Sequence, residues 1–98
     1  MTHHIKILKP FADVIIEGNK TFEIRKNDRG YNRGDFVKFQ TITQESFSSF
    51  ETTHEINDKL YEITYVLSSG FGLQEGYCVF GIKEVHDEQK EASPDDAS

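Results

Sequence analysis

The stretch KTFEIRKNDRGYNRGD, residues 20–35, carries the most distinctive pattern of the chain. Residues 21–25 alternate as a β-strand does, and we expect Phe22 and Ile24 to face the core, with Glu23 and Arg25 on the opposite face. Residues 27–34 are rich in Asn, Asp and Gly, which favour turns. The pattern predicts a strand, then a loop that leads into the next strand.

Strand patterns recur on both sides of this stretch, at residues 3–8, 36–43, 60–67 and 77–85. Only residues 10–17 show apolar residues at helical spacing. Pro10 suits the start of a helix, and Gly18 suits the position just past its end. We therefore predict a mainly β fold with one short helix (α+β), in the form of a small β-barrel of five or six strands, closed or nearly closed.

Two segments stand apart from this pattern. Residues 44–59 are polar and predict either a long hairpin arm or a loop, with Phe47 and Phe50 as candidates to anchor it to the body. Residues 86–98 carry five acids and one lysine, and we expect this acidic tail to be disordered. The expected organisation is one domain over residues 1–85, followed by the tail.

Composition restricts the class of protein. Cys78 is the only cysteine and the four histidines show no zinc-ligand spacing with it, so we expect no disulfide, no metal and no cofactor. The sequence shows neither an apolar run of about 20 residues nor a secretory signal, so we expect a cytoplasmic monomer with no membrane partner.

Charge is unevenly distributed along the chain. The net charge is −6, but residues 20–38 hold six cations against three acids. Arginine and lysine donate to phosphates and carboxylates, so this segment is a candidate nucleic-acid-binding site formed by Lys20, Arg25, Lys26 and Arg29. The alternative is that Glu23 and Arg25 form a surface ion pair worth about 0 to 1 kcal/mol.

Two aromatic residues in glycine-containing loops, Tyr31 and Phe71, are further candidates. Each ring could stack on a nucleic-acid base, or could close an open end of a small barrel. A catalytic site would draw on Lys20 and Glu23, with Glu75 as a partner from the second loop. Cys78, within a predicted strand, is expected to be a buried small hydrophobe.

The spaced pieces Lys20-x-x-Glu23-Ile24-Arg25, Asn27-Asp28-Arg29-x-Tyr31-x-x-Gly34-Asp35 and Gly70-Phe71-Gly72-Leu73 occur in order. In these the chain resembles the ASCH family of PUA-like domains, specifically a branch of small bacterial and phage proteins of unknown function. The resemblance implies a PUA-like barrel with a cleft beside residues 20–25.

The same resemblance implies RNA or a modified nucleoside as the partner. One similar group of small amidohydrolases deacylates N4-acetylcytidine and has a lysine that matches Lys20, but it carries a catalytic threonine where this chain has Glu23. Two hypotheses follow: a binding module for RNA or a nucleoside, and a small hydrolase in which Lys20 acts with Glu23 or Glu75.

Overall fold

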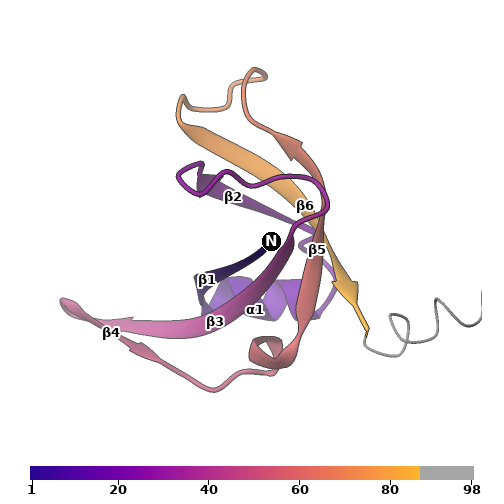
Figure 1. The fold of residues 1–98 in the computed structure, drawn as a ribbon. Coiled ribbons are helices and arrows are strands. Elements are labelled where there is room, and N and C mark those ends of the chain that lie inside the picture. The colour runs from indigo at the N-terminus through magenta and orange to yellow at the C-terminus, as the bar shows by residue number, and fades with distance from the viewer. Residues whose placement is uncertain (87–98) are drawn as a thin grey trace, which may run out of the picture.

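The computed structural model describes residues 1–86. It contains six strands, one α-helix and one short 3-10 helix, whose bounds are β1 Thr2–Leu8, α1 Lys9–Ile16, β2 Phe22–Lys26, β3 Phe36–Glu45, β4 Ser48–Glu51, η1 Glu55–Asp58, β5 Leu60–Leu67 and β6 Tyr77–Val85 (Figure 1). The predicted mainly β fold with one short helix is confirmed. The predicted disordered tail, apart from His86, lies outside the described residues.

All six strands belong to one sheet in the order β1-β3-β5-β6-β2, and β4 pairs with β3. The β1–β3 pair is parallel and the other pairs are antiparallel. The sheet curls towards a barrel, but within the described residues no backbone ladder joins its two end strands, β1 and β2. A fully closed barrel, one of the two forms predicted, is therefore not what the chain forms.

The helix forms where its sequence signals predicted it. Pro10 lies in the first turn of α1, where a missing N–H costs no helical hydrogen bond. Gly18 follows the helix with φ +83°, in the left-handed region that glycine adopts without strain. Together these residues confine the helix to two turns, and it covers one face of the sheet beside β1 and β3 (Figure 1).

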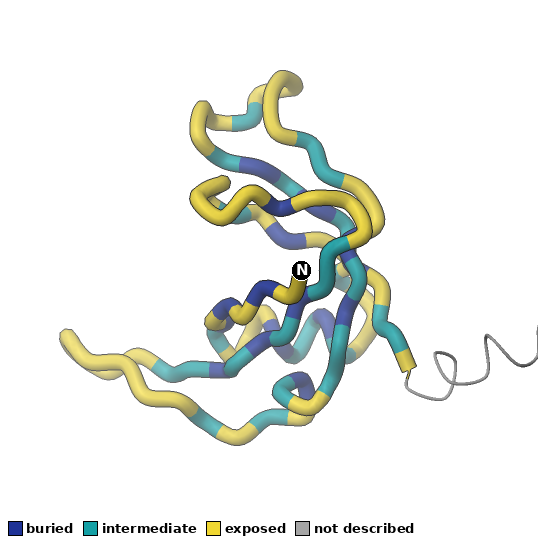
Figure 2. Tube along the Cα trace, in the orientation of Figure 1, coloured by how far each residue is buried: buried dark blue, intermediate teal, exposed yellow. Residues whose placement is uncertain are grey.

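The core lies on the concave face of the curled sheet. Alternate residues of β1 and β3 are buried there, since side chains two apart share a face of a strand. The largest fully buried residues are Phe80, Ile5, Ile56, Ile63, Val37, Thr41 and Cys78. Buried segments therefore cluster in the middle of the molecule, with exposed loops at its ends (Figure 2).

The face of β2 is opposite to the one predicted. Glu23 is only 4% exposed, whereas Phe22 and Ile24 are 42% and 56% exposed. The period of two was correctly identified, but apolar character was a poor guide to the inward face. The reason is that Glu23 is neutralised inside the fold by two cations, so it can occupy a buried position that an unpaired carboxylate could not.

A departure from regular alternation also occurs in β5, where a period of two would place Tyr65 on the same face as Tyr61 and Ile63. The pairing of β5 with β6 shifts register between Ile63 and Tyr65, and Tyr65 is exposed. An irregularity of this kind inserts a residue and re-aims the side chains that follow it. The predicted alternation therefore holds for the first half of β5 only.

Residues 44–59 form the predicted hairpin arm and then η1. The outer part of β3 and all of β4 project from the body, and the tight turn between them places Ser46 at φ +56°. Phe47 at the tip is fully exposed and Phe50 is about half exposed, so neither residue is the anchor that the sequence suggested. Ile56 in η1, which is completely buried, fixes this segment to the core.

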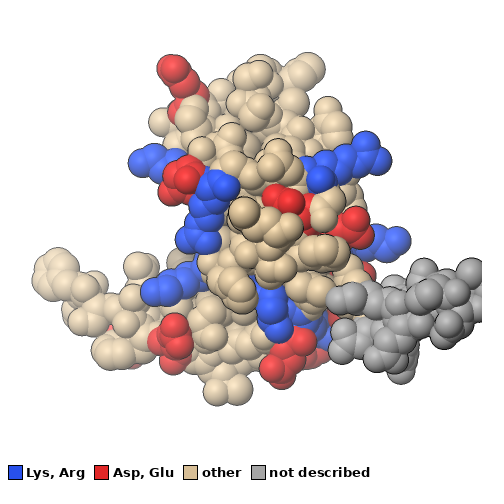
Figure 3. All heavy atoms as spheres, viewed as in Figure 1, with Lys and Arg blue, Asp and Glu red and all other residues tan. Residues whose placement is uncertain are grey.

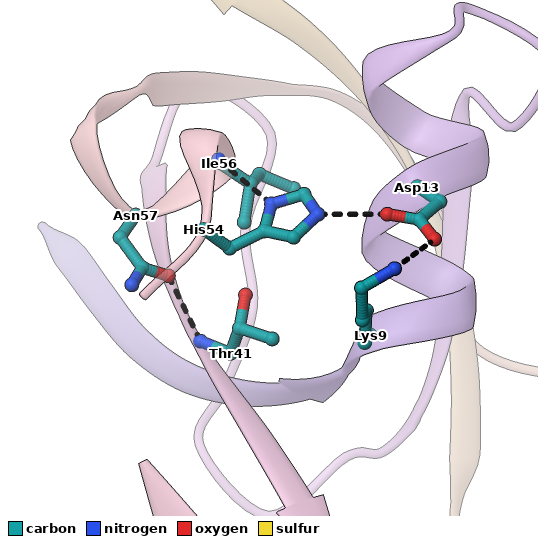
Figure 4. A network of polar contacts seen from close by, with 6 residues as sticks. All are labelled: Lys9, Asp13, Thr41, His54, Ile56 and Asn57. Carbon is teal, nitrogen blue, oxygen red and sulfur yellow. Dashed lines mark hydrogen bonds and ion pairs between the residues drawn. The ribbon is translucent and has the colours of Figure 1, made fainter. Parts of the chain in front are cut away.

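Polar contacts add a second tie between η1 and the body (Figure 4). The Nδ1 atom of His54 accepts the backbone N–H of Ile56, so its Nε2–H is the donor to Asp13 of α1, at 2.8 Å. Lys9 also donates to Asp13, and the Asn57 side-chain oxygen accepts the backbone N–H of Thr41. These contacts connect α1, β3 and the segment of η1.

No helix within residues 1–86 has both the length and the apolar character needed to cross a lipid bilayer.

Candidate functional site

A cleft of about 510 Å³ lies beside the free edge of β2, where the sheet does not close. Side chains from the end of β1, the start of α1 and the whole of β2 surround it. Its lining consists of Lys6, Ile7, Leu8, Phe11, Lys20, Phe22, Glu23, Ile24, Arg25, Lys26 and Tyr77. This volume is within the range of pockets that hold small molecules, so the cleft is the candidate functional site.

A triad of charged groups, Lys20, Glu23 and Arg25, lies in the cleft. Glu23 accepts a hydrogen bond from Lys20 Nζ through one carboxylate oxygen and from Arg25 Nε, at 2.8 Å, through the other. All three side chains are at least partly buried, and that of Glu23 is 5% exposed. The predicted contact between Glu23 and Arg25 is thus present, but it is a buried interaction and not the surface ion pair considered as its alternative.

Two cations on one carboxylate leave the triad with a net positive charge. Hydrogen bonds to charged groups are stronger than those between neutral groups, and burial reduces the screening of their field by water. Because both oxygens of Glu23 already accept strong donors, the carboxylate holds Lys20 and Arg25 in fixed positions. The triad can therefore present preorganised cations to a ligand.

Arginine side chains also bridge the opening between the two end strands. Arg25 Nη2 donates to the backbone oxygen of Lys6 at 2.8 Å, and Arg29 Nη1 donates to the backbone oxygen of His4. His4 and Lys6 are two residues apart in β1, so both carbonyl groups point out of the same unpaired edge. Two guanidinium groups thereby satisfy acceptors that a neighbouring strand would otherwise satisfy.

Aromatic rings flank the lysine of the triad. Lys20 Nζ lies 5.7 Å from the ring centroid of Phe11 and 5.3 Å from that of Phe22, which are distances typical of cation–π interaction. Both rings are about half exposed, and Ile24 beside them is also exposed. The cleft therefore combines an exposed apolar surface with cations, as expected for a ligand that has a flat ring and a polar or anionic group.

Other residues selected from the sequence lie elsewhere. Tyr31 is 5% exposed and packs between His3 and Phe80, with ring centroids 4.7 Å from each, so its ring cannot stack on a ligand base. Phe71 and Glu75 are exposed in the loop between β5 and β6 and do not line the cleft. Of the eight candidates, Lys20, Glu23, Arg25 and Lys26 come together in the cleft.

Sequence reasoning did not select Phe11, Ile24 or Tyr77 for the site. Phe11 was assigned to the helix and Ile24 to the core, because each fitted an apolar periodicity. One signal could have shown the role of Ile24. A strand in which charged and apolar residues alternate can bury either face, and Lys20 just before the strand is a possible partner for a buried Glu23.

The thiol of Cys78 is not a candidate nucleophile. It is completely buried in β6, and burial raises the pKa of this thiol above its ordinary value. Within residues 1–86, no group of three or more His, Cys, Asp or Glu side chains is arranged to hold a metal ion.

Charges are mixed over the rest of the body. On the face drawn in Figure 3, basic and acidic side chains lie next to one another, and the outer part of the projecting arm shows no basic side chain. This agrees with the sequence of residues 44–53, which contains Glu45 and Glu51 and neither lysine nor arginine. The surface outside the cleft therefore offers no continuous basic track on this face.

Comparison with known proteins places the chain in a family. Residues 2–82 match the family described as "Domain of unknown function (DUF3850)", and the chain belongs to this family. The matched range contains all the elements of the fold except the end of β6.

A phage protein is among the relatives. The chain is 34% identical over 56 residues to the "Uncharacterized 12.9 kDa protein in GpA 3'region" of Escherichia phage P2. The aligned part is 57% of this chain and 51% of the phage protein, so the chain spans about half the length of the curated relative that it matches. The resemblance to small phage proteins of unknown function, expected from the sequence, is confirmed at this level.

Proposed function

We propose that the protein is a binding module for RNA or a nucleoside, and that the ligand lies in the cleft between β1 and β2. The observation that carries this proposal is the triad of Lys20, Glu23 and Arg25, positioned next to the exposed rings of Phe11 and Phe22. Nucleobases stack on aromatic rings, while phosphates and base edges accept hydrogen bonds from lysine and arginine.

The resemblance of the sequence to ASCH domains supports the same proposal. We propose that the chain is an ASCH-type, PUA-like domain, because the Lys20-x-x-Glu23-Ile24-Arg25 pattern that carries the resemblance also builds the cleft. In this proposal Lys20 and Arg25 contact the ligand, Lys26 contributes from the rim, and Glu23 organises the two cations without contacting the ligand itself.

Shift perturbation in the NMR spectrum of the ¹⁵N-labelled protein tests the proposal. The four nucleosides and short single-stranded RNAs are titrated separately, and binding should shift the amide signals of β2 and of the first turn of α1. Affinity for the RNA should also decrease with salt, because each phosphate contact contributes about 0.7 to the logarithmic slope.

Two variants make this test specific. Lys20→Ala should weaken binding while the spectrum stays that of a folded protein, since Arg25 still donates to the buried carboxylate of Glu23. Lys83→Ala removes an exposed lysine that does not line this cleft and should leave the affinity unchanged. Perturbations confined to the opposite side of the fold, or equal effects of both variants, would exclude the cleft as the binding site.

A second candidate function is a small amidohydrolase, and the direct contact of Lys20 with Glu23 in the cleft favours it. In such an enzyme Glu23 and Lys20 would carry protons while water adds to the acetyl carbonyl of N4-acetylcytidine. Cleavage of the amide C–N bond would then release acetate and cytidine.

Chromatography of N4-acetylcytidine after incubation with the protein distinguishes these two functions. Under the binding function no cytidine forms above the rate without protein. Formation of cytidine that is abolished in Lys20→Ala, while that variant remains folded, would replace the binding function with the hydrolase.

A further inference from the structure

The cleft and the rest of the surface have net charges of opposite sign. Four cations and one acid line the cleft, a net charge of +3. The other side chains of residues 1–86 include six lysines or arginines and eleven acids, a net charge of −5. Positive charge is therefore concentrated in one small site on a body that is otherwise negative.

This distribution restricts the size of an anionic ligand. A strand of RNA that continued beyond the cleft would carry one phosphate per nucleotide over a surface of net negative charge, which repels it. A ligand with a single phosphate group would stay within the positive region. The volume of about 510 Å³ is likewise in the range for one small molecule.

Two lysines at the rim have their ammonium groups available for such a phosphate. Lys6 and Lys26 line the cleft and are exposed, and within the described residues no carboxylate forms an ion pair with either. Lys20 and Arg25, in contrast, already contact Glu23. The cleft thus contains a fixed pair of cations next to a second pair that has no acidic partner.

The apolar part of the lining matches a single flat ring. Phe11 and Phe22, both near Lys20, expose about half of their surface, and Ile24 adds further exposed apolar area. Stacking of one nucleobase on an aromatic side chain contributes about 1 to 3 kcal/mol and tolerates any base. One base and one phosphate together account for both parts of the cleft.

We propose that the ligand of the cleft is a free nucleoside monophosphate, with its base against Phe11 and Phe22 and its phosphate held by Lys6 and Lys26. This inference rests on the proposed binding function and specifies the class of ligand that it binds. The same phosphorylated nucleotide also occurs at the 5′ end of an RNA, so the test must separate these two sources.

Isothermal titration calorimetry with five kinds of probe provides that separation. The probes are the four nucleosides, their 5′-monophosphates, inorganic phosphate, and hexanucleotide RNAs with and without a 5′-phosphate. At least one monophosphate should bind about tenfold more tightly than its nucleoside, the effect of about one charge-assisted hydrogen bond, and more tightly than inorganic phosphate or either hexanucleotide.

Variants test the assignment of the phosphate. Lys6→Gln and Lys26→Gln should each weaken monophosphate binding about five- to tenfold and change nucleoside binding less than about twofold, because a nucleoside has no phosphate to lose. Lys83→Gln should change neither affinity. All three substitutions replace exposed lysines, so folding is expected to persist and is checked by circular dichroism.

The results separate the failure of this inference from that of the binding function. Tighter binding of either hexanucleotide, or equal affinities of monophosphate and nucleoside, would overturn the inference and leave the binding function in place. Equal effects of the rim variants on nucleoside and monophosphate would also overturn it. If no probe binds, both proposals fail.

Discussion

The guanidinium group of Arg25 donates to the backbone oxygen of Lys6 at 2.8 Å and so joins two strands whose backbones are not paired. The same side chain donates to Glu23, so one residue of β2 connects the buried carboxylate to the free edge of β1. The candidate ligand site and the integrity of the fold therefore depend on the same arginine.

Replacing Arg25 with lysine should destabilise the protein although the charge is kept. A lysine has no planar fork and cannot donate to Glu23 and to the Lys6 oxygen in the same geometry. Losing one hydrogen bond to a charged group lowers the free energy of unfolding by about 1.5 to 3 kcal/mol. Urea denaturation measures this loss, with Arg33→Lys as the exposed control, and equal midpoints for the two variants would contradict the bridging role.

Stability should fall in acid partly because of Asp13. The hydrogen bond from His54, followed by that from Lys9, lowers the pKa of Asp13 below its ordinary value of 3.8. A carboxylate with a lowered pKa in the folded state contributes stability above its unfolded pKa, and this contribution is lost as the pH falls through the folded pKa. Urea midpoints measured from pH 6 to pH 2.5 should decrease below about pH 4.

Asp13→Asn should make that acid dependence shallower without removing it. The pKa of Asp35 is also lowered, chiefly by its hydrogen bond with His3, so Asp35 contributes over the same range of pH. An unchanged pH dependence in Asp13→Asn would show that the pKa of Asp13 is the same in the folded and unfolded states, and so that its contact with His54 does not stabilise the fold.

Thr41→Val should stabilise the protein. Thr41 is completely buried, and its hydroxyl oxygen has no hydrogen-bond partner within the described residues. A buried polar group without a partner costs about 1 to 3 kcal/mol, and valine has nearly the same shape without the hydroxyl. The free energy of unfolding should therefore rise by about 1 kcal/mol, while Thr43→Val, at the less buried next position on the same face, should change it little.

Two substitutions in the segment after β3 should have opposite consequences. Phe47→Ser removes an aromatic side chain that is fully exposed at the tip of the arm, so the free energy of unfolding should change by less than about 0.5 kcal/mol. Ile56→Ala, in η1, removes a completely buried side chain and should cost about 2 to 5 kcal/mol. A large effect of Phe47→Ser would mean that the arm packs on the body in solution.

Secondary structure was predictable because local signals agreed with the fold. Pro10 and Gly18 mark the helix ends, and the strand segments have the expected composition and period. The face of β2 was not predictable from the same signals. Which side of Phe22-Glu23-Ile24 is buried depends on the partners of Glu23, and one of these, Lys20, lies outside the strand.

The candidate site was predictable in part for a related reason. Lys20, Glu23 and Arg25 are close in sequence, so β2 and the residues just before it bring them together directly. Phe11 reaches the cleft only through the packing of α1 beside β1, and Tyr31 is drawn into the core by His3 and Phe80 from other strands. Contacts between segments that are distant in the sequence cannot be predicted from the spacing of neighbouring residues.

The unpaired edges of β1 and β2 give the fold a mechanical property. In an ordinary sheet, separating two neighbouring strands breaks every rung of a backbone ladder. Across this opening the side-chain donors to the β1 backbone are Arg25 and Arg29, so widening the gap breaks two arginine contacts and no strand pairing. Opening the cleft therefore requires the loss of contacts from two side chains, each worth about 1.5 to 3 kcal/mol, while every backbone ladder of the sheet stays intact.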